Sequence, residues 1–247
     1  LDFPEPRTLP AYCTGKGQRP IHAAAWHGHL EAVELLLQCG VSSNSLNTPR
    51  SSTPLHFAGS TGKPAVINML LAHRAEIDAR QESGMTPLDI CISFSRADGV
   101  KALLDARASC ATSDQGLSPL HAAAVLSAGP DIIASLLEAR ACPHSRYNPR
   151  PGTAMYYVCL SASLSHRLGR RGVFTCVGYH VWNATPLLLA SVVGAWPEAH
   201  ILQEYKADAN AANSRGAIAA SLASFRHDDM DAEWLRSATN RFSAIRS

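Results

Sequence analysis

The sequence has few aromatic residues and no hydrophobic run long enough to cross a membrane. Aromatic residues make up 6% of its 247 residues. The longest apolar run, from Thr185 to Gly194, is about half the length of a membrane span. Neither sign of charge is in large excess, since the formal net charge is only +2. No overall field therefore favours nucleic acid or an anionic membrane as a partner.

The cysteines are seven in number and scattered, and no two of them form a C-x-x-C pair. This pattern argues against a disulfide framework and fits a reducing compartment, so we expect a cytoplasmic protein. The chain begins with Leu1 rather than methionine. Two alternatives therefore stay open: a fragment of a longer protein, and a protein of an organelle matrix or stroma whose targeting peptide has been removed.

What the sequence does contain is a tetrapeptide that recurs at a fixed interval. Its first four copies start 34, 33 and 32 residues apart, and the fifth follows after 67 residues, which is about two intervals. A period of about 33 residues predicts a stacked repeat array, and the usual product of such an array is a binding surface. The five copies are Arg19-Pro20-Ile21-His22, Thr53-Pro54-Leu55-His56, Thr86-Pro87-Leu88-Asp89, Ser118-Pro119-Leu120-His121 and Thr185-Pro186-Leu187-Leu188.

The first unit, from Arg19 to Asn44, predicts two helices. Pro20 suits the first turn of a helix, because its φ is already set and no backbone donor is needed there. Gly28 ends that helix after about two turns. A second amphipathic helix follows and stops at Gly40, because leucine and valine recur at helical spacing. Its apolar residues are Leu30, Val33, Leu36 and Leu37.

This unit resembles the ankyrin repeat. Arg19 to Val41 (R-P-I-H-A-A-A-W-H-G-H-L-E-A-V-E-L-L-L-Q-C-G-V) matches that family's pattern almost throughout. The resemblance implies an all-α solenoid of about five to seven helix-turn-helix units, with an irregular segment before the last two. The other matches in phase are Pro54 to Asp78 and Pro119 to Ala141, and, more weakly, Met85 to Ala108 and Thr185 to Asn210.

The resemblance divides the chain into four parts. An extended N-terminal arm rich in proline and glycine (1–18) precedes four repeats (19–144), an irregular segment (145–184), and a repeat with a C-terminal cap (185–247). The cap has polar residues suited to solvent: Arg226, Asp228, Asp229 and Asp231. In the irregular segment the phase survives, but the second-helix positions hold Arg167, Gly169, Arg170, Arg171 and Gly172. Two interpretations stay open, a degraded repeat and an insertion.

The position after each second helix also departs from the family's pattern. The expected glycine is present as Gly40, but Arg74, Arg107, Arg140 and Lys206 stand at the equivalent positions. A basic side chain at a helix C-terminus interacts favourably with the macrodipole, which offsets part of the cost of losing glycine. We interpret these four residues as solvated helix ends.

No group of residues predicts catalysis or metal binding. His22, His56 and His121 share one position in successive repeats, which in the ankyrin family ties adjacent turns together, so we expect structural imidazoles. The cluster of His22, His27 and His29 lacks zinc-like spacing, and Cys91 stands where other repeats place a small core residue. We therefore predict a protein that is not an enzyme, with no catalytic residue, cofactor or metal.

The ankyrin resemblance implies that function lies on the groove formed by the protruding turns and the first-helix ends. Several of these positions are large and apolar, which is typical of a partner site. The alternative is that the N-terminal arm or the irregular segment folds back and covers them. The partner-binding candidates are Trp26, His27, Met85, Phe94, Leu117, Val125, Leu126, Val192 and Val193.

We therefore expect a scaffold or adaptor whose concave groove binds one or more proteins, without nucleic acid and without a membrane-spanning segment. Two alternatives remain. One is an accessory subunit built stably into a large complex, for example a photosynthetic or respiratory complex of an organelle, which could itself be membrane-bound. The other is the targeting module of a larger enzyme.

Overall fold

The computed structural model describes residues 19–48, 50–112, 116–152, 154–168, 173–223 and 233–234. The expected N-terminal arm and the cap residues Arg226, Asp228, Asp229 and Asp231 lie outside the described residues. So do Gly169, Arg170, Arg171 and Gly172. The chain divides into two compact units, Leu1–Ser109 and Cys110–Ser247, and each is described by itself.

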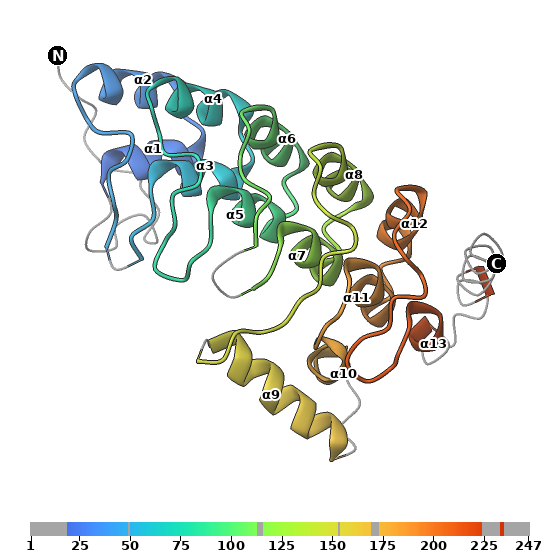
Figure 1. Ribbon diagram of the computed structural model, residues 1–247. Coiled ribbons are helices and arrows are strands. Elements are labelled where there is room, and N and C mark those ends of the chain that lie inside the picture. The colour runs from blue at the N-terminus through green and yellow to red at the C-terminus, as the bar shows by residue number, and fades with distance from the viewer. Residues whose placement is uncertain are drawn as a thin grey trace. The chain divides into compact units, whose positions relative to one another are not determined.

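The first unit is a stack of three helix pairs (Figure 1). Its inner helices, α1, α3 and α5, pack on one another in order, and so do its outer helices, α2, α4 and α6. This is the helix-turn-helix layering of the predicted all-α solenoid, which is confirmed. The pairs are α1 (Pro20–His27) with α2 (Leu30–Gln38), α3 (Pro54–Thr61) with α4 (Pro64–Ala72), and α5 (Pro87–Ser93) with α6 (Ala97–Asp105).

The recurring tetrapeptide starts each inner helix. Thr53 and Thr86 adopt extended backbone before α3 and α5, and proline takes the first helical position. In both turns the side chain three residues on, His56 or Asp89, accepts a hydrogen bond from the N-cap backbone. This capping arrangement satisfies donors that the first turn leaves free. Gly28 ends α1 at φ 73°, in the left-handed region that glycine adopts at little cost.

The outer helices end in the same left-handed turn whether or not glycine is present. The φ angle is 85° at Gly40, 60° at Arg74 and 68° at Arg107. Each of these residues donates its backbone N–H to the carbonyl three residues back, and the next residue donates to the carbonyl five residues back. These turns satisfy helix-end carbonyls. At Arg74 and Arg107, however, a residue with a side chain adopts the left-handed backbone conformation, which costs about 1 kcal/mol.

The second unit also contains stacked helix pairs, but two helices stand outside the stack (Figure 1). Helix α11 packs directly on α7, and α12 packs directly on α8. Helices α9 and α10 pack on each other, and α10 also packs on α11. The bounds are α7 (Pro119–Leu126), α8 (Pro130–Glu138), α9 (Ala154–Arg167), α10 (Val173–His180), α11 (Pro186–Val193), α12 (Trp196–Glu204) and α13 (Ala219–Ala223).

An isolated antiparallel β-bridge between Tyr147 and Ala184 joins the two ends of the segment that contains α9 and α10. The backbone N–H of Tyr147 donates to the carbonyl of Ala184 (2.9 Å), and that of Asn183 donates to the carbonyl of Tyr147 (2.8 Å). The chain therefore leaves the stack at Tyr147 and returns beside the same point. We call residues 148–183 the excursion.

Close contact between α9 and α10 depends on a glycine. A Cβ built on Gly178 of α10 would collide with the Cβ of Ala162 on α9. Glycine thus lets the two helices approach more closely than any other residue would. Within the described part of the chain, no helix is long and apolar enough to cross a membrane.

Candidate functional site

Three histidines, on α1, α3 and α7, each join their inner helix to the turn that follows it in the stack. The Nε2–H groups of His22 and His56 donate to the carbonyls of Ser45 (2.9 Å) and Met85 (3.1 Å). Their Nδ1 atoms accept backbone N–H groups of Arg19 and Thr53, each at 3.2 Å. Because Nδ1 accepts, the proton lies on Nε2 and both rings are neutral. The predicted structural role of these imidazoles is confirmed.

His121 makes the same kind of bond across a much longer stretch of sequence. Its Nε2 bonds the carbonyl of Ala184 at 3.2 Å, and its Nδ1 lies 2.6 Å from Oγ of Ser118. Burial lowers the pKa of His121 to about 4, and it also lowers the pKa of His22 and of His56. These side chains are neutral scaffold groups at physiological pH.

Asp89 takes the histidine position in the third repeat and behaves differently. Its Oδ2 accepts the backbone N–H and the hydroxyl of Thr86, both at 3.0 Å. An ionised carboxylate has no proton to donate, so Asp89 secures its own turn only. Burial raises the pKa of its carboxyl group.

The predicted partner-binding residues of the first unit differ in exposure. Phe94, at the end of α5, is 49% exposed. Trp26, at the end of α1, is half-buried, and its ring packs edge-on against Phe57 of α3 with centroids 6.1 Å apart. His27 is half-buried and stacks on His29 at 5.6 Å.

Two residues on the protruding turns complete this surface. The side chain of Met85, ahead of α5, is half-buried. Leu46, on the turn ahead of α3, is 52% exposed. Sequence reasoning missed Leu46, although a leucine within the polar stretch Ser42 to Ser52 was a signal that could have identified it. We call Trp26, His27, Leu46, Met85 and Phe94 the inner face of the first unit.

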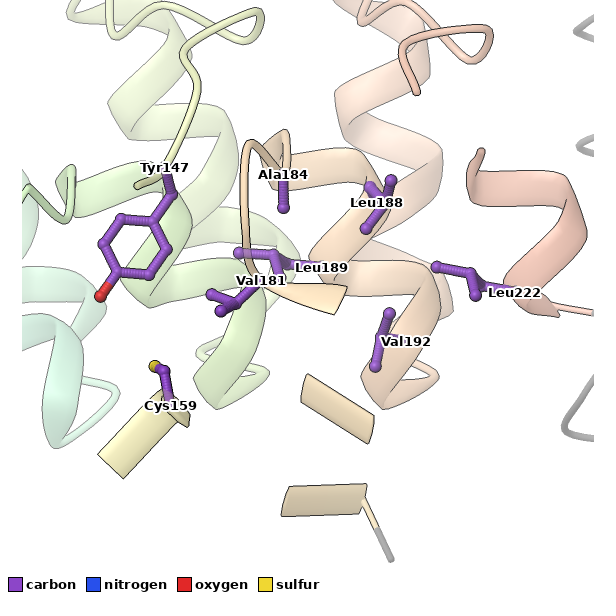
Figure 2. Close-up of a cluster of buried hydrophobic side chains, with 8 residues drawn as sticks. All are labelled: Tyr147, Cys159, Val181, Ala184, Leu188, Leu189, Val192 and Leu222. Carbon is purple, nitrogen blue, oxygen red and sulfur yellow. The ribbon is translucent and has the colours of Figure 1, made fainter. Parts of the chain in front are cut away.

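In the second unit, three of the predicted residues pack in a cluster to which the excursion also contributes. Leu117 and Val125 are half-buried and Val192 is buried, and all three belong to one hydrophobic cluster. Cys176 and Val177 of α10 are partly buried and pack against this cluster. Figure 2 shows the buried members of the cluster: Tyr147, Cys159, Val181, Ala184, Leu188, Leu189, Val192 and Leu222.

The partner-binding role of Leu117, Val125 and Val192 stays a prediction, but these side chains share one hydrophobic cluster with residues of α10. This packing is compatible with the alternative in which the irregular segment folds back onto them. Leu126, at the end of α7, is 50% exposed, and Val193 is half-buried.

Metal-ligating groups and the buried thiol Cys91 were the candidate reactive features of the part of the chain that the structure describes. There, no three His, Cys, Asp or Glu side chains are grouped so that they could hold a metal ion. Cys91 is fully buried, as predicted for a core residue, and burial raises the pKa of its thiol to about 12. A thiol in that state is a poor nucleophile at neutral pH.

Comparison with known proteins agrees with this repeat geometry. A family profile described as "Ankyrin repeats (3 copies)" matches residues 21–114. The Drosophila melanogaster protein "ARF GTPase-activating protein Git" is 34% identical over 88 residues, which are 36% of this chain and 12% of that protein. Mouse (Mus musculus) "Rabankyrin-5" is 30% identical over 110 residues, which are 43% of this chain and 9% of that protein.

Mouse "Neurogenic locus notch homolog protein 1" is 32% identical over 113 residues, which are 45% of this chain and 4% of that protein. The chain thus spans a small part of each of these curated relatives. What they share with it is the repeat, which is a protein–protein interaction module. On the repeat period, the histidine-bridged helix pairs and these matches, residues 21–114 are ankyrin repeats.

Proposed function

We propose that this chain is a non-catalytic adaptor that holds a protein partner on the inner face of its first unit. The observation that carries the proposal is Phe94, which is an aromatic side chain left 49% exposed at the end of an inner helix. Aromatic anchors contribute a large share of the binding energy in many protein interfaces. Leu46, 52% exposed, adds a second apolar side chain.

The same face combines exposed anchors with others that are already fixed. Trp26 rests against Phe57, and Phe57 in turn lies edge-on to the buried His22 with ring centroids 5.3 Å apart. A side chain held in this way loses little freedom on binding, which lowers the entropic cost of association. This arrangement supports a preformed binding face.

Phe94→Ala tests the proposal most directly. Protein partners captured by the chain from its native source are first identified, and their affinities for the wild type and the variant are then compared. Burying the exposed half of a phenylalanine contributes about 1.4 kcal/mol, so we expect Kd to rise about tenfold. The matched control is Leu35→Ala, because Leu35 is 48% exposed but lies on the outer helix α2.

Unchanged affinity of Phe94→Ala would refute this face as the site. Trp26→Ala is a less specific variant, because it also removes the contact with Phe57. It therefore requires a melting curve beside the binding curve. For the compartment, we propose the cytoplasm, because reducing compartments keep thiols unpaired. The thiols that support this are Cys39, Cys91, Cys142, Cys159 and Cys176.

A further inference from the structure

Helix α9 has a buried side and an apolar exposed side. Cys159, Ala162 and Ser163 lie on its buried side, with at most 6% of each residue exposed. On the other side, Tyr157, Leu160, Leu164 and Leu168 are 60, 48, 59 and 76% exposed. The last of these continues the helical turn, because its N–H donates to the carbonyl of Leu164.

These exposed side chains form a broad face. At 100° per residue, the four of them together with Val158, which is 40% exposed, cover an arc of roughly 160° around the helix. A helix face of that width is normally turned toward a core. Large apolar faces left in water mark an interaction site, so α9 requires an explanation that its packing on α10 does not supply.

In the sequence on both sides of α9, every Lys, Arg, Asp or Glu is an arginine. From Ala139 to Pro197 the sequence has six arginines, no lysine, and neither aspartate nor glutamate. The rest of the chain carries all 20 acidic residues and only 16 basic ones. The overall charge of +2 therefore conceals a basic segment with α9 at its middle, and Arg167 ends that helix.

We propose that the outward face of α9 lies on the surface of a membrane that contains anionic lipids. Its apolar side chains enter the interface, and nearby arginines pair with lipid phosphates. Guanidinium groups bind phosphate through two parallel hydrogen bonds, and no carboxylate of this segment repels the headgroups. Apolar burial and attraction to anionic lipid together are what hold interfacial helices on membranes.

The shape of α9 favours a membrane over a protein groove. The 14-residue helix is about 21 Å long, so it lies flat and does not span. Its exposed face is convex and wide, whereas a helix that docks into a groove needs only a narrow line of anchors. The Tyr147–Ala184 bridge joins the ends of the excursion, so α9 can contact a surface while α7 and α11 remain stacked.

Vesicle sedimentation tests this proposal with the full chain. The probes are vesicles of phosphatidylcholine alone, and of phosphatidylcholine with about 30% phosphatidylserine, a fraction that gives a strongly negative surface. We expect binding to the anionic vesicles that is at least about tenfold stronger than to the neutral ones and that weakens at high salt. The double variant L160S/L164S should lose at least about tenfold in partitioning.

Matched controls separate these effects from general ones. Leu35→Ser removes a leucine of equal exposure, 48%, from the first unit and should bind as the wild type does. Arg167→Glu should weaken binding more than Lys101→Glu, because both change the net charge equally but only Arg167 is on α9. All five substituted positions are exposed, and circular dichroism checks that each variant is folded.

Absence of binding to the anionic vesicles, or equal binding of wild type and L160S/L164S, would overturn the proposal. So would a protein that co-purifies through Leu160 and Leu164 in the absence of vesicle binding, because the face would then belong to that protein. The membrane proposal and the partner-binding proposal can be refuted independently of each other. Phe94→Ala should still bind vesicles, and L160S/L164S should still capture the protein partner.

Discussion

Acidification should destabilise this chain through its buried histidines, and His121 provides the clearest measurement. The ring is fully buried and bonded at both nitrogens, and its pKa is lowered from 6.5 to about 4. Between those two values the unfolded chain binds a proton that the folded ring does not accept. The stability that depends on neutral His121 is therefore fully present above about pH 6.5 and is lost as the pH falls toward 4.

The size of the loss follows from the two pKa values of His121. Thermodynamic linkage predicts that the free energy of unfolding falls by about 2 kcal/mol at pH 5 and by about 3 kcal/mol at pH 4, relative to neutral pH. The pKa values of His22 and His56 are also lowered by burial, so their contributions have the same sign. Asp89 acts in the opposite direction, because a raised carboxyl pKa adds stability as the pH falls from its folded value toward 3.8.

Urea unfolding between pH 7.5 and 5 measures this effect in the wild type and in His121→Leu. Leucine is a natural choice, because Leu188 holds the same position in the next repeat. The variant should be less stable at pH 7.5, since the carbonyl of Ala184 loses its donor. Its stability should nevertheless fall by about 2 kcal/mol less than that of the wild type on going to pH 5.

A matched variant at the exposed His73 controls for the loss of a histidine as such. Equal decreases in the free energy of unfolding for wild type and His121→Leu would refute the reasoning. That result would mean that His121 titrates alike in the folded and the unfolded chain.

Three further predictions concern the stability and reactivity of the scaffold. Arg107→Gly should raise the free energy of unfolding by about 1 kcal/mol, and Gly40→Arg should lower it by a similar amount, because both backbones have positive φ; a melting experiment in which both variants match wild type would contradict this. Tyr147→Phe should stabilise by about 1 kcal/mol in urea unfolding, because the buried hydroxyl has no hydrogen-bond partner among the described residues; a loss of stability would show that the hydroxyl is bonded. Iodoacetamide should modify the exposed Cys39 of the folded chain and spare Cys91, as read by mass spectrometry; rapid native modification of Cys91 would show that its site opens readily.

The helices of the first unit could be predicted closely from sequence. Pro20, Gly28 and Gly40 mark where α1 begins and where α1 and α2 end, and the structure agrees to within two residues. These signals act within one turn of helix, so they need no knowledge of distant contacts. The partner-binding role of the inner face, by contrast, stays a prediction.

The second unit could not be predicted in the same way. The sequence marks residues 145–184 as irregular but contains no signal that α11 stacks on α7. That arrangement is accompanied by the bond from His121 to the carbonyl of Ala184, 63 residues away, and by a cluster that brings Val125 and Val192 together with residues of α10. Long-range packing of this kind leaves no local pattern.

The sequence by itself determined the repeat, its period and the family, because each repeat is built from nearest-neighbour contacts. Only the tertiary structure decided which apolar residues face solvent. Phe94 remains exposed, Val192 is buried, and Leu164 of the excursion is turned outward. The physical reason is that exposure depends on what folds against a side chain, and in the second unit this includes residues of helices outside the repeat pattern.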